Sequence, residues 1–270
     1  MKTENKVALV IGSIKGIGKG IGLFLANKGI KVAFNYFDWE ESLEELEQDL
    51  SEISTPRLLV KTNLLETDKI PGLIKKVVDN FGRLDILINN IERGGWPAVH
   101  GPYTSDQWDL EMATTLRAKQ WLFEHSLPYL KESGGTVINL SSIAGIVGRS
   151  GPASYIFNEG YSAANRGISL LTETWARLGA PEVRVNEIML GIIESRHGKN
   201  TRGWGLLTDT QKQDILDHTL IERTGTIDDV IKAVWFLIND APFMTGSVIR
   251  LDGGYVLGGD KVAPMPKGVL

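Results

Sequence analysis

Three glycines near the amino terminus are spaced as in a loop that binds the phosphates of a dinucleotide. Gly12, Gly16 and Gly18 follow a short apolar run and open a segment with helical periodicity. Glycine lets the backbone turn sharply and lets a pyrophosphate approach without a Cβ in the way. The first turn of the helix then offers free N–H groups and a partial positive charge to the anion. A tight turn without a ligand would use glycines too, but the position after a first strand favours dinucleotide binding.

The elements that must position this loop alternate between strands and helices. Nearly continuous apolar runs predict strands over Lys6–Ile11, Lys31–Tyr36, Arg57–Lys61, Leu84–Asn89, Gly135–Leu140, Val183–Ile188 and Ser247–Leu251. Helical periodicity predicts helices over Gly16–Asn27, Trp39–Leu50, Ile70–Phe81, Asp106–Lys131 and Tyr161–Leu178. Apolar strands alternating with helices predict a doubly wound parallel sheet of about seven strands, covered on both faces. We therefore expect one α/β domain of Rossmann type over residues 1–270.

Two segments fall outside this pattern. Residues 195–221 combine basic side chains, among them Arg196 and Arg202, with a helical pattern from Asp209. A long insertion at the carboxyl edge of such a sheet predicts a substrate lobe or lid. Its basic side chains either attract an anionic carbonyl substrate or form a solvated loop. Residues 256–270 contain glycines and prolines and are predicted to be an irregular tail.

Composition narrows the function classes. The 270 residues carry a net charge of −4 and contain no cysteine. Disulfides, thiolate zinc sites and cysteine nucleophiles are therefore excluded, and the charge argues against nucleic acid or a membrane surface as the main partner. The histidines show no metal-ligand spacing, and no apolar run approaches the roughly 18 residues of a membrane span. We expect a cytoplasmic protein without a bound metal.

Several motifs, taken in order, resemble the short-chain dehydrogenase/reductase family from about Lys6 to Tyr255. They are Gly12/Gly16/Gly18, Leu84 to Asn90, Val137 to Ser142, Tyr161 to Ala164, Arg184-Val185-Asn186, Thr245-Gly246 and Asp252-Gly253-Gly254. The resemblance implies a nicotinamide cofactor and NAD(P)-dependent oxidoreductase chemistry. It places these residues at the cofactor: Gly12, Ser13, Lys15, Gly16, Ile17, Gly18, Tyr36, Asn63, Leu64, Asn89, Asn90, Gly191 and Ile193.

The end of the second strand bears on the choice of cofactor. In a dinucleotide fold, an acidic residue there would bind the ribose 2′-hydroxyl and repel a 2′-phosphate, but this chain has Tyr36. Lys15 is placed like the basic residue of NADP-preferring relatives and could neutralise a 2′-phosphate, although Asp38 nearby opposes it. NADP(H) is favoured, and NAD(H) is possible.

The family pattern implies a serine that orients the carbonyl, a tyrosine acid/base, a nearby lysine and a helix-borne asparagine. Ser142 occupies the serine position. Tyr155 has the commoner spacing after Ser142, but the residues after Tyr161 fit the family pattern better, with a six-residue insertion before it. We choose Tyr161 and keep Tyr155 as the alternative. Asn165 stands in the place of the lysine and Thr115 in that of the asparagine, so the catalytic tetrad is atypical.

These features predict an NADP(H)-dependent oxidoreductase that reduces a ketone or oxoacyl-type carbonyl, slowly because the lysine is replaced. The alternative is a catalytically impaired dinucleotide-binding protein that serves as a sensor or assembly subunit. The glycine loop would also suit an S-adenosylmethionine methyltransferase, but the other motifs fit that reading poorly. Large side chains on two helices, Trp121, Phe123, Leu171 and Trp175, further predict a homotetramer or a homodimer.

Overall fold

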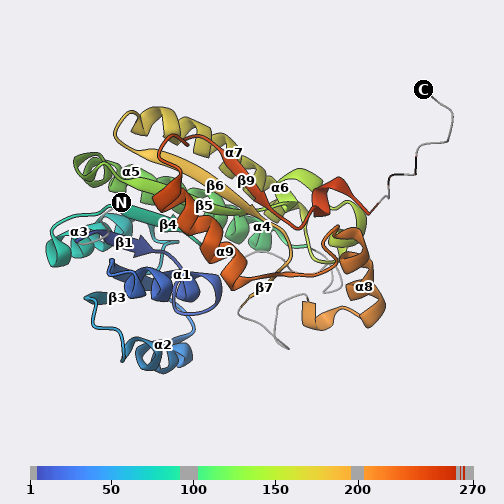
Figure 1. Cartoon of the computed structure of the whole chain (residues 1–270), viewed down its shortest axis with the longest axis horizontal. Helices are drawn as coiled ribbons and strands as arrows, with labels where there is room; N and C mark the ends of the chain where they lie inside the picture. Colours follow the sequence, from blue (N-terminus) through green and yellow to red (C-terminus); the bar gives the residue numbers. More distant parts are fainter. Residues whose placement is uncertain (1–4, 92–102, 196–203, 260–261, 263, 265–270) are drawn as a thin grey trace.

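The computed structural model describes residues 5–91, 103–195, 204–259, 262 and 264. Its centre is a seven-stranded parallel sheet with the strand order β3-β2-β1-β4-β5-β6-β9 (Figure 1). The strands are β1 (Val7–Val10), β2 (Lys31–Tyr36), β3 (Arg57–Lys61), β4 (Ile86–Asn89), β5 (Thr136–Ser142), β6 (Arg184–Leu190) and β9 (Val248–Leu251). Every predicted run overlaps one of these strands, and β5 and β6 each end two residues beyond the predicted run. The doubly wound Rossmann-type architecture is confirmed.

Helices cover both faces of the sheet. They are α1 (Gly16–Asn27), α2 (Leu43–Leu50), α3 (Ile70–Phe81), α4 (Ser105–Glu111), α5 (Ala118–Ser133), α6 (Ala144–Val147), α7 (Glu159–Gly179), α8 (Asp209–His218) and α9 (Ile227–Trp235). Side chains of a strand alternate between the two faces. Ala8 and Val10 of β1 therefore pack toward α1 and α9, whereas Val7 and Leu9 pack toward α3, α5 and α7. Both faces are apolar because both are buried.

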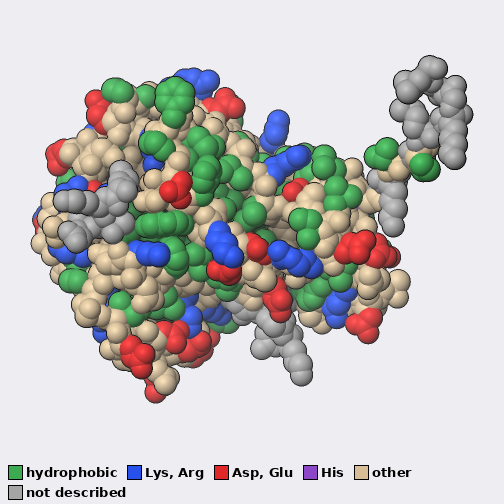
Figure 2. Space-filling view, viewed as in Figure 1, with side chains coloured by type: hydrophobic (Ala, Val, Ile, Leu, Met, Phe, Trp, Pro, Cys, Tyr) green, Lys and Arg blue, Asp and Glu red, His purple; other side chains and the backbone are tan. Residues whose placement is uncertain are grey.

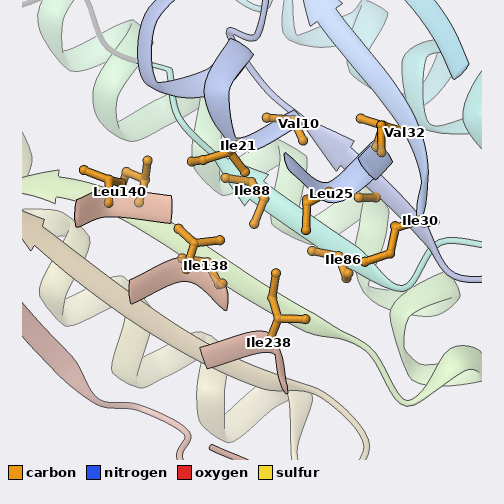
Figure 3. Packing of buried hydrophobic residues seen from close by; sticks show 14 of the residues in the cluster. Val10, Ile21, Leu25, Ile30, Val32, Ile86, Ile88, Ile138, Leu140 and Ile238 are labelled. Carbon is orange, nitrogen blue, oxygen red and sulfur yellow. The ribbon is translucent and has the colours of Figure 1, made fainter. Parts of the chain in front are cut away.

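One of the two core layers lies between the sheet and α1. In Figure 3, Ile21 and Leu25 of α1 lie beside Val10 and Ile88 of the sheet, and all four side chains are buried. Burying such side chains contributes roughly 1.5–3 kcal/mol each relative to exposure. This packing fixes the start of α1 against the ends of β1 and β4, where the glycine loop lies.

The predicted helix over Asp106–Lys131 is interrupted. Helices α4 and α5 are joined by a wider, π-helical turn over Met112–Arg117, labelled η4. Such turns often mark functional positions in helices, and this one contains the buried Thr114 and Thr115. The predicted helix start at Trp39 also differs, because Trp39 adopts a left-handed φ of 64° before a short 3-10 turn over Glu40–Ser42.

A short second sheet was not predicted. Its strands β7 (Ile193–Glu194) and β8 (Gly225–Thr226) pair in parallel. Each is two residues long, too short for an apolar pattern to be visible in the sequence. The two strands join the ends of the segment that contains α8. Helix α8 begins at Asp209 and lies at the opposite end of the molecule from α3 in Figure 1.

The segment around α8 packs on a third apolar cluster that contains Phe157, Tyr161, Leu207, Ile215 and Tyr255. The basic part of the predicted lobe, including Arg196 and Arg202, lies outside the described residues. Most of the predicted tail does too, and a 3-10 turn over Tyr255–Leu257 precedes it. The lobe and tail boundaries stay predictions.

Two of the aromatic side chains expected at a subunit contact belong to the core instead. Phe123 and Trp175 are buried, and their rings stack with centroids 4.8 Å apart. Trp175 also donates a hydrogen bond to Gln120 at 3.1 Å. The sequence interpretation was wrong for this pair, because α5 and α7 bury these rings against each other within one chain.

Acidic side chains gather over α2 and around α8 on the surface shown in Figure 2. On α2 they face solvent while Leu46 and Leu50 are buried, as expected for an amphipathic helix. Within the described ranges, no helix combines the length and apolar character that a bilayer crossing requires.

A buried polar cluster holds the end of β5. The Lys119 ammonium donates to the Leu140 carbonyl at 2.6 Å, and the Glu187 carboxylate accepts hydrogen bonds from the Ser141 and Ser169 hydroxyls. Lys119 and Glu187 are fully buried. Burial raises the pKa of Glu187, while the two serine bonds and the charges of Lys119 and Arg166 act in the opposite direction. The cluster ties α5, β5, β6 and α7 together just before Ser142.

We predict that Lys119→Met destabilises the protein by about 3–5 kcal/mol, because it removes the buried cation that acts on a buried carboxylate. Adding Glu187→Gln should restore part of that loss, since the amide can still accept both serine bonds. Urea unfolding of the two single variants and the double variant measures this coupling. Lys75→Met is the matched control, because its ion pair with Asp79 is exposed and is worth less than about 0.5 kcal/mol.

The loss should also depend on pH. Because the folded-state pKa of Glu187 lies above its ordinary value of 4.5, ionisation of this carboxyl disfavours the folded state. The loss of unfolding free energy caused by Lys119→Met should therefore be small in acid and grow as the pH rises above the ordinary carboxyl pKa. Additive losses in the cycle, or a penalty independent of pH, would contradict this account.

Candidate active site

The glycine loop forms the turn between β1 and α1, at the carboxyl edge of the sheet. Gly12 and Gly16 adopt left-handed φ values of 63° and 61°, which glycine adopts without strain. A Cβ on Gly18 would lie 2.3 Å from the Gly12 carbonyl oxygen, so no side chain fits there. Asn90, after β4, donates to that same carbonyl at 3.0 Å. The first turn of α1 has no side-chain cap, so its N–H groups face the loop as an anion site requires.

Two residues assigned to the cofactor support the loop from inside. The Ser13 hydroxyl donates to the Val10 carbonyl at 2.9 Å and also contacts the Asn35 carbonyl at 3.2 Å. Asn89 donates to the Asn139 side chain at 2.9 Å. Ser13 and Asn89 are fully buried. Their side chains therefore fix the backbone beneath the site rather than forming its wall.

A cavity of about 220 Å³ extends from the glycine loop along the ends of β2 and β3. Of the residues predicted at the cofactor, its wall contains Gly12, Lys15, Ile17, Tyr36, Asn63, Leu64 and Asn90. The Asn63 side chain accepts a hydrogen bond from the Leu65 N–H at 3.1 Å. It thus shapes the turn after β3, and Leu64 is buried beside it.

An aromatic group at this cavity was missed by sequence reasoning. Phe37, Asp38 and Trp39 line the wall beside Tyr36. The Lys15 ammonium lies 2.7 Å from the centroid of the Trp39 ring, an arrangement in which the π face attracts the cation. The three residues directly after Tyr36 were the available signal, but Trp39 was assigned to a helix start.

A second cavity of about 490 Å³ lies beside the first. Ile17 and Ser195 line both cavities, so the two are contiguous along the carboxyl edge of the sheet. The second wall contains Ser142, Tyr161, Gly191 and Ile193 from the predicted site. Carboxyl ends of parallel strands are where ligands bind in open α/β sheets.

Ser142 and Tyr161 reach the second cavity from different elements. Ser142 is the last residue of β5, and its hydroxyl accepts the Ala144 N–H at 3.1 Å. Tyr161 lies in the first turn of α7. Tyr155 is in a preceding 3-10 turn and is not among the described residues that line either cavity. The geometry thus favours Tyr161 over Tyr155.

The start of α7 is held by a polar relay that sequence reasoning also missed. The Asn158 side chain caps the helix by accepting the Tyr161 N–H at 2.8 Å, a stabilising arrangement at helix starts. Asn158 in turn donates to the buried Glu111 carboxylate at 2.7 Å, which also accepts the Tyr103 hydroxyl. An asparagine three residues before Tyr161 was the visible signal for the cap.

The positions that resemble the catalytic lysine and asparagine are withdrawn from the cavities. Asn165 donates to the Tyr161 carbonyl at 2.9 Å within its own helix, and Thr115 lies in the π-helical turn. Both are fully buried, and neither is among the described residues that line either cavity. Asn165 Oδ1 and Thr115 Oγ1 have no hydrogen-bond partner in the described part of the chain.

A family model described as Enoyl-(Acyl carrier protein) reductase matches residues 12–256. The chain belongs to the short-chain dehydrogenase/reductase family. A 3-oxoacyl-(acyl-carrier-protein) reductase of Staphylococcus aureus is 32% identical over 254 residues, covering 92% of this chain and 97% of the relative. One from Thermotoga maritima is 29% identical over 262 residues, covering 95% and 100%. Levodione reductase has the same fold, with a TM-score of 0.83 at 23% identity, covering 94% of this chain and 98% of its own.

This short-chain dehydrogenase/reductase is an NAD(P)-dependent oxidoreductase, as its sequence motifs predicted. The glycine turn fits a pyrophosphate because Gly12 and Asn90 line the cavity and the first turn of α1, which has no side-chain cap, begins beside them. The glycine loop lies at one cavity, and Ser142 and Tyr161 line the contiguous second one. The roles of the individual site residues stay predictions.

Proposed function

We propose that this chain is an NADP(H)-dependent reductase of a ketone or oxoacyl-type carbonyl. The observation that carries this proposal is that Ser142 and Tyr161 line the same cavity. This cavity is contiguous with the one at the glycine loop. A hydroxyl beside a phenol can orient a carbonyl oxygen and give it a proton. Relatives named as 3-oxoacyl reductases support carbonyl chemistry for this chain.

In the proposed reaction, the Ser142 hydroxyl donates a hydrogen bond to the carbonyl oxygen and fixes its orientation. The reduced nicotinamide supplies the hydride that the carbonyl carbon accepts. The Tyr161 phenol gives its proton to the oxygen as charge develops there, and the resulting phenolate is reprotonated from solvent. The Asn158 cap holds the backbone of Tyr161 for this transfer, while Glu111 holds Asn158.

Replacement of the lysine makes the two directions of the reaction unequal. A tyrosine in water titrates at a pKa of about 10, so about one in a thousand is a phenolate at pH 7. A neighbouring ammonium would favour the phenolate, but Asn165 is neutral and turned toward its own helix. Alcohol oxidation needs the phenolate as a base, whereas carbonyl reduction needs the abundant phenol. The proposal is therefore a slow reductase that oxidises alcohols poorly at neutral pH.

We predict that Tyr161→Phe lowers ketone reduction by about 10²-fold or more, because the proton donor is lost. Tyr155→Phe is the matched control and should leave the rate unchanged. Asn165→Lys should raise alcohol oxidation at pH 7 more than reduction, and raising the pH should do the same for the wild type. Single-turnover rates in both directions between pH 6 and 10 measure these effects.

If the Tyr161→Phe variant reduces ketones at the wild-type rate, this mechanism is wrong. A protein that binds NADPH but reduces none of a broad panel of ketones would instead be the dinucleotide-binding sensor or assembly subunit. The withdrawal of Thr115 and Asn165 from the cavity walls is the observation that favours this second function.

The preference for NADP(H) rests on the environment of Lys15. Its ammonium lies on the cavity wall with Tyr36 and Trp39. An acidic residue at the position of Tyr36 would select NAD(H), but this chain has none there. Asp38 shares this wall, but Glu40, two residues on, is neutralised by an ion pair with Lys61. Lys15, held over the Trp39 ring, thus brings a positive charge to this end of the cavity, beside the negative charge of Asp38.

We predict that Lys15→Met weakens the binding of adenosine 2′,5′-bisphosphate about tenfold, because a charge-assisted contact to the phosphate is lost. Binding of AMP should change little. Lys28→Met is the matched control, since Lys28 also lies over an aromatic ring, 5.2 Å from the Phe24 centroid, but not on the described cavity wall. Isothermal titration calorimetry measures both nucleotides. If Lys15→Met weakens the binding of both nucleotides equally, Lys15 does not select the 2′-phosphate.

The proposal for assembly is a homotetramer, with a homodimer next. Helices α4, α5 and α7 expose Trp108, Trp121, Leu170 and Leu178. A shallow groove beside them is lined by Leu110, Met112, Leu116 and Leu171, among others. Contiguous exposed apolar side chains on a monomer are typical of an interaction surface, and a second copy offers the same surface in return.

We predict that light scattering at micromolar concentration gives a mass of four chains of 29.7 kDa, with two chains as the intermediate species. Leu170→Glu should lower that mass without unfolding the protein, because 67% of the Leu170 side chain is exposed in one chain. A monomeric wild type would reject the assembly.

A further inference from the structure

The wall of the larger cavity shows which carbonyl compounds fit beside Tyr161. Ile156 and Phe157, from the segment just before α7, lie on one part of this wall. The Phe157 ring is buried, with its centroid 5.8 Å from that of Tyr161. Ile192, Trp204 and Leu216 line other parts of it. A carbonyl placed at Ser142 and Tyr161 thus has apolar side chains on several sides.

The charged side chains on this wall are more often acidic than basic. Among the described residues that line the cavity, Glu194 and Glu222 carry negative charge and Arg223 carries positive charge. The Arg223 guanidinium is already engaged by Asp229, with nitrogen–oxygen distances of 2.8 and 3.3 Å. Figure 2 shows further acidic side chains gathered around α8, where Asp214 and Asp217 flank the cavity residue Leu216.

A substrate carboxylate or phosphate would therefore meet like charges and no unengaged cation among the described residues of the wall. The volume of about 490 Å³ falls within the usual range for small-molecule sites. Such a site gains most from apolar area that is buried on binding and loses from any anionic group brought near the two carboxylates.

From this combination we infer that the substrate is an uncharged ketone bearing an apolar group of about ring size, and not an anionic keto acid. The inference rests on the proposed reductase function and narrows its substrate class. Phe157 and Ile156 determine specificity for the apolar group, while Glu194 and Glu222 exclude anions. The basic segment at 196–202 led us to consider anionic substrates, but the described wall has the opposite charge.

Three para-substituted acetophenones test this inference, because they differ in charge far from the reacting carbonyl. They are 4-acetylbenzamide, 4-acetylbenzoate and 4-(aminomethyl)acetophenone. We expect kcat/KM for the amide to exceed that for the benzoate about tenfold at low salt, and this ratio to narrow in about 1 M salt through screening. The double variant E194Q/E222Q should bring the ratio near one. Glu182→Gln, an exposed change after α7, should leave the ratio unchanged.

The apolar wall is tested separately by Phe157→Ala. This variant should raise KM for the amide at least fivefold while its affinity for NADPH stays that of the wild type, because Phe157 lines only the larger of the two cavities. Rescue by Phe157→Leu would show that hydrocarbon at this position is sufficient. An unchanged KM in Phe157→Ala would overturn the assignment of this wall.

Binding of the corresponding alcohols to the NADP⁺-saturated protein, followed by calorimetry, separates this inference from the proposed function. If the ketones are not reduced but the uncharged alcohol binds about tenfold more tightly than the carboxylate, the reductase proposal fails and the substrate class stands. If the benzoate is bound or reduced as well as the amide, or if none of the compounds binds, the substrate class is overturned. If the ratio of kcat/KM for the amide to that for the benzoate is the same in E194Q/E222Q as in the wild type, the role of these carboxylates is likewise overturned.

Discussion

Burial of the parallel sheet on both faces is the constraint on which the rest of this structure depends. Helices α1 and α9 cover one face and α3, α5 and α7 cover the other, so the middle of each strand has to be apolar. Groups that meet a ligand can then lie only at the ends of the strands. The glycine loop after β1, Asn90 after β4 and Ser142 at the end of β5 all lie at the same carboxyl edge. The reversal of strand order between β1 and β4 opens the space that the cavities occupy.

Fixing Ser142 at this edge requires polar groups inside an apolar layer. Lys119 and Glu187 are buried behind the last residues of β5, and desolvating two such charges costs several kcal/mol each. Their hydrogen bonds to Leu140, Ser141 and Ser169 offset part of that cost. A layer of leucines would avoid that desolvation cost, but it would make no directional bond to the strand end. Directional bonds therefore set the position of Ser142 more narrowly than packing alone.

The sequence allowed the sheet to be predicted because strands buried on both faces form nearly continuous apolar runs. It also allowed the glycine loop to be placed, since backbone conformation there depends on residues adjacent in the chain. Contacts between distant segments left no such trace. Nothing in the sequence showed that Phe123 stacks on Trp175, that Lys15 lies over Trp39 or that Glu111 holds Asn158. The two residues of β7 pair with β8 across the whole of α8, so their pairing depends on a fold already formed.

The insertion before Tyr161 links the two halves of the site. Tyr161 can line the cavity because α7 begins at Glu159 with Asn158 as its cap, and that start lies within the inserted residues. The same insertion places Phe157 on the cavity wall and leaves Tyr155 in a turn outside it. One segment thus sets both the position of Tyr161, the proposed proton donor, and the shape of the cavity beside it. Phe157 of the apolar wall and Asn158 of the helix cap are adjacent in the chain, so the same few residues set the wall and the position of the phenol. In the proposed reaction, substrate selection and proton transfer therefore depend on neighbouring residues, and Asn158 fixes where the helix begins.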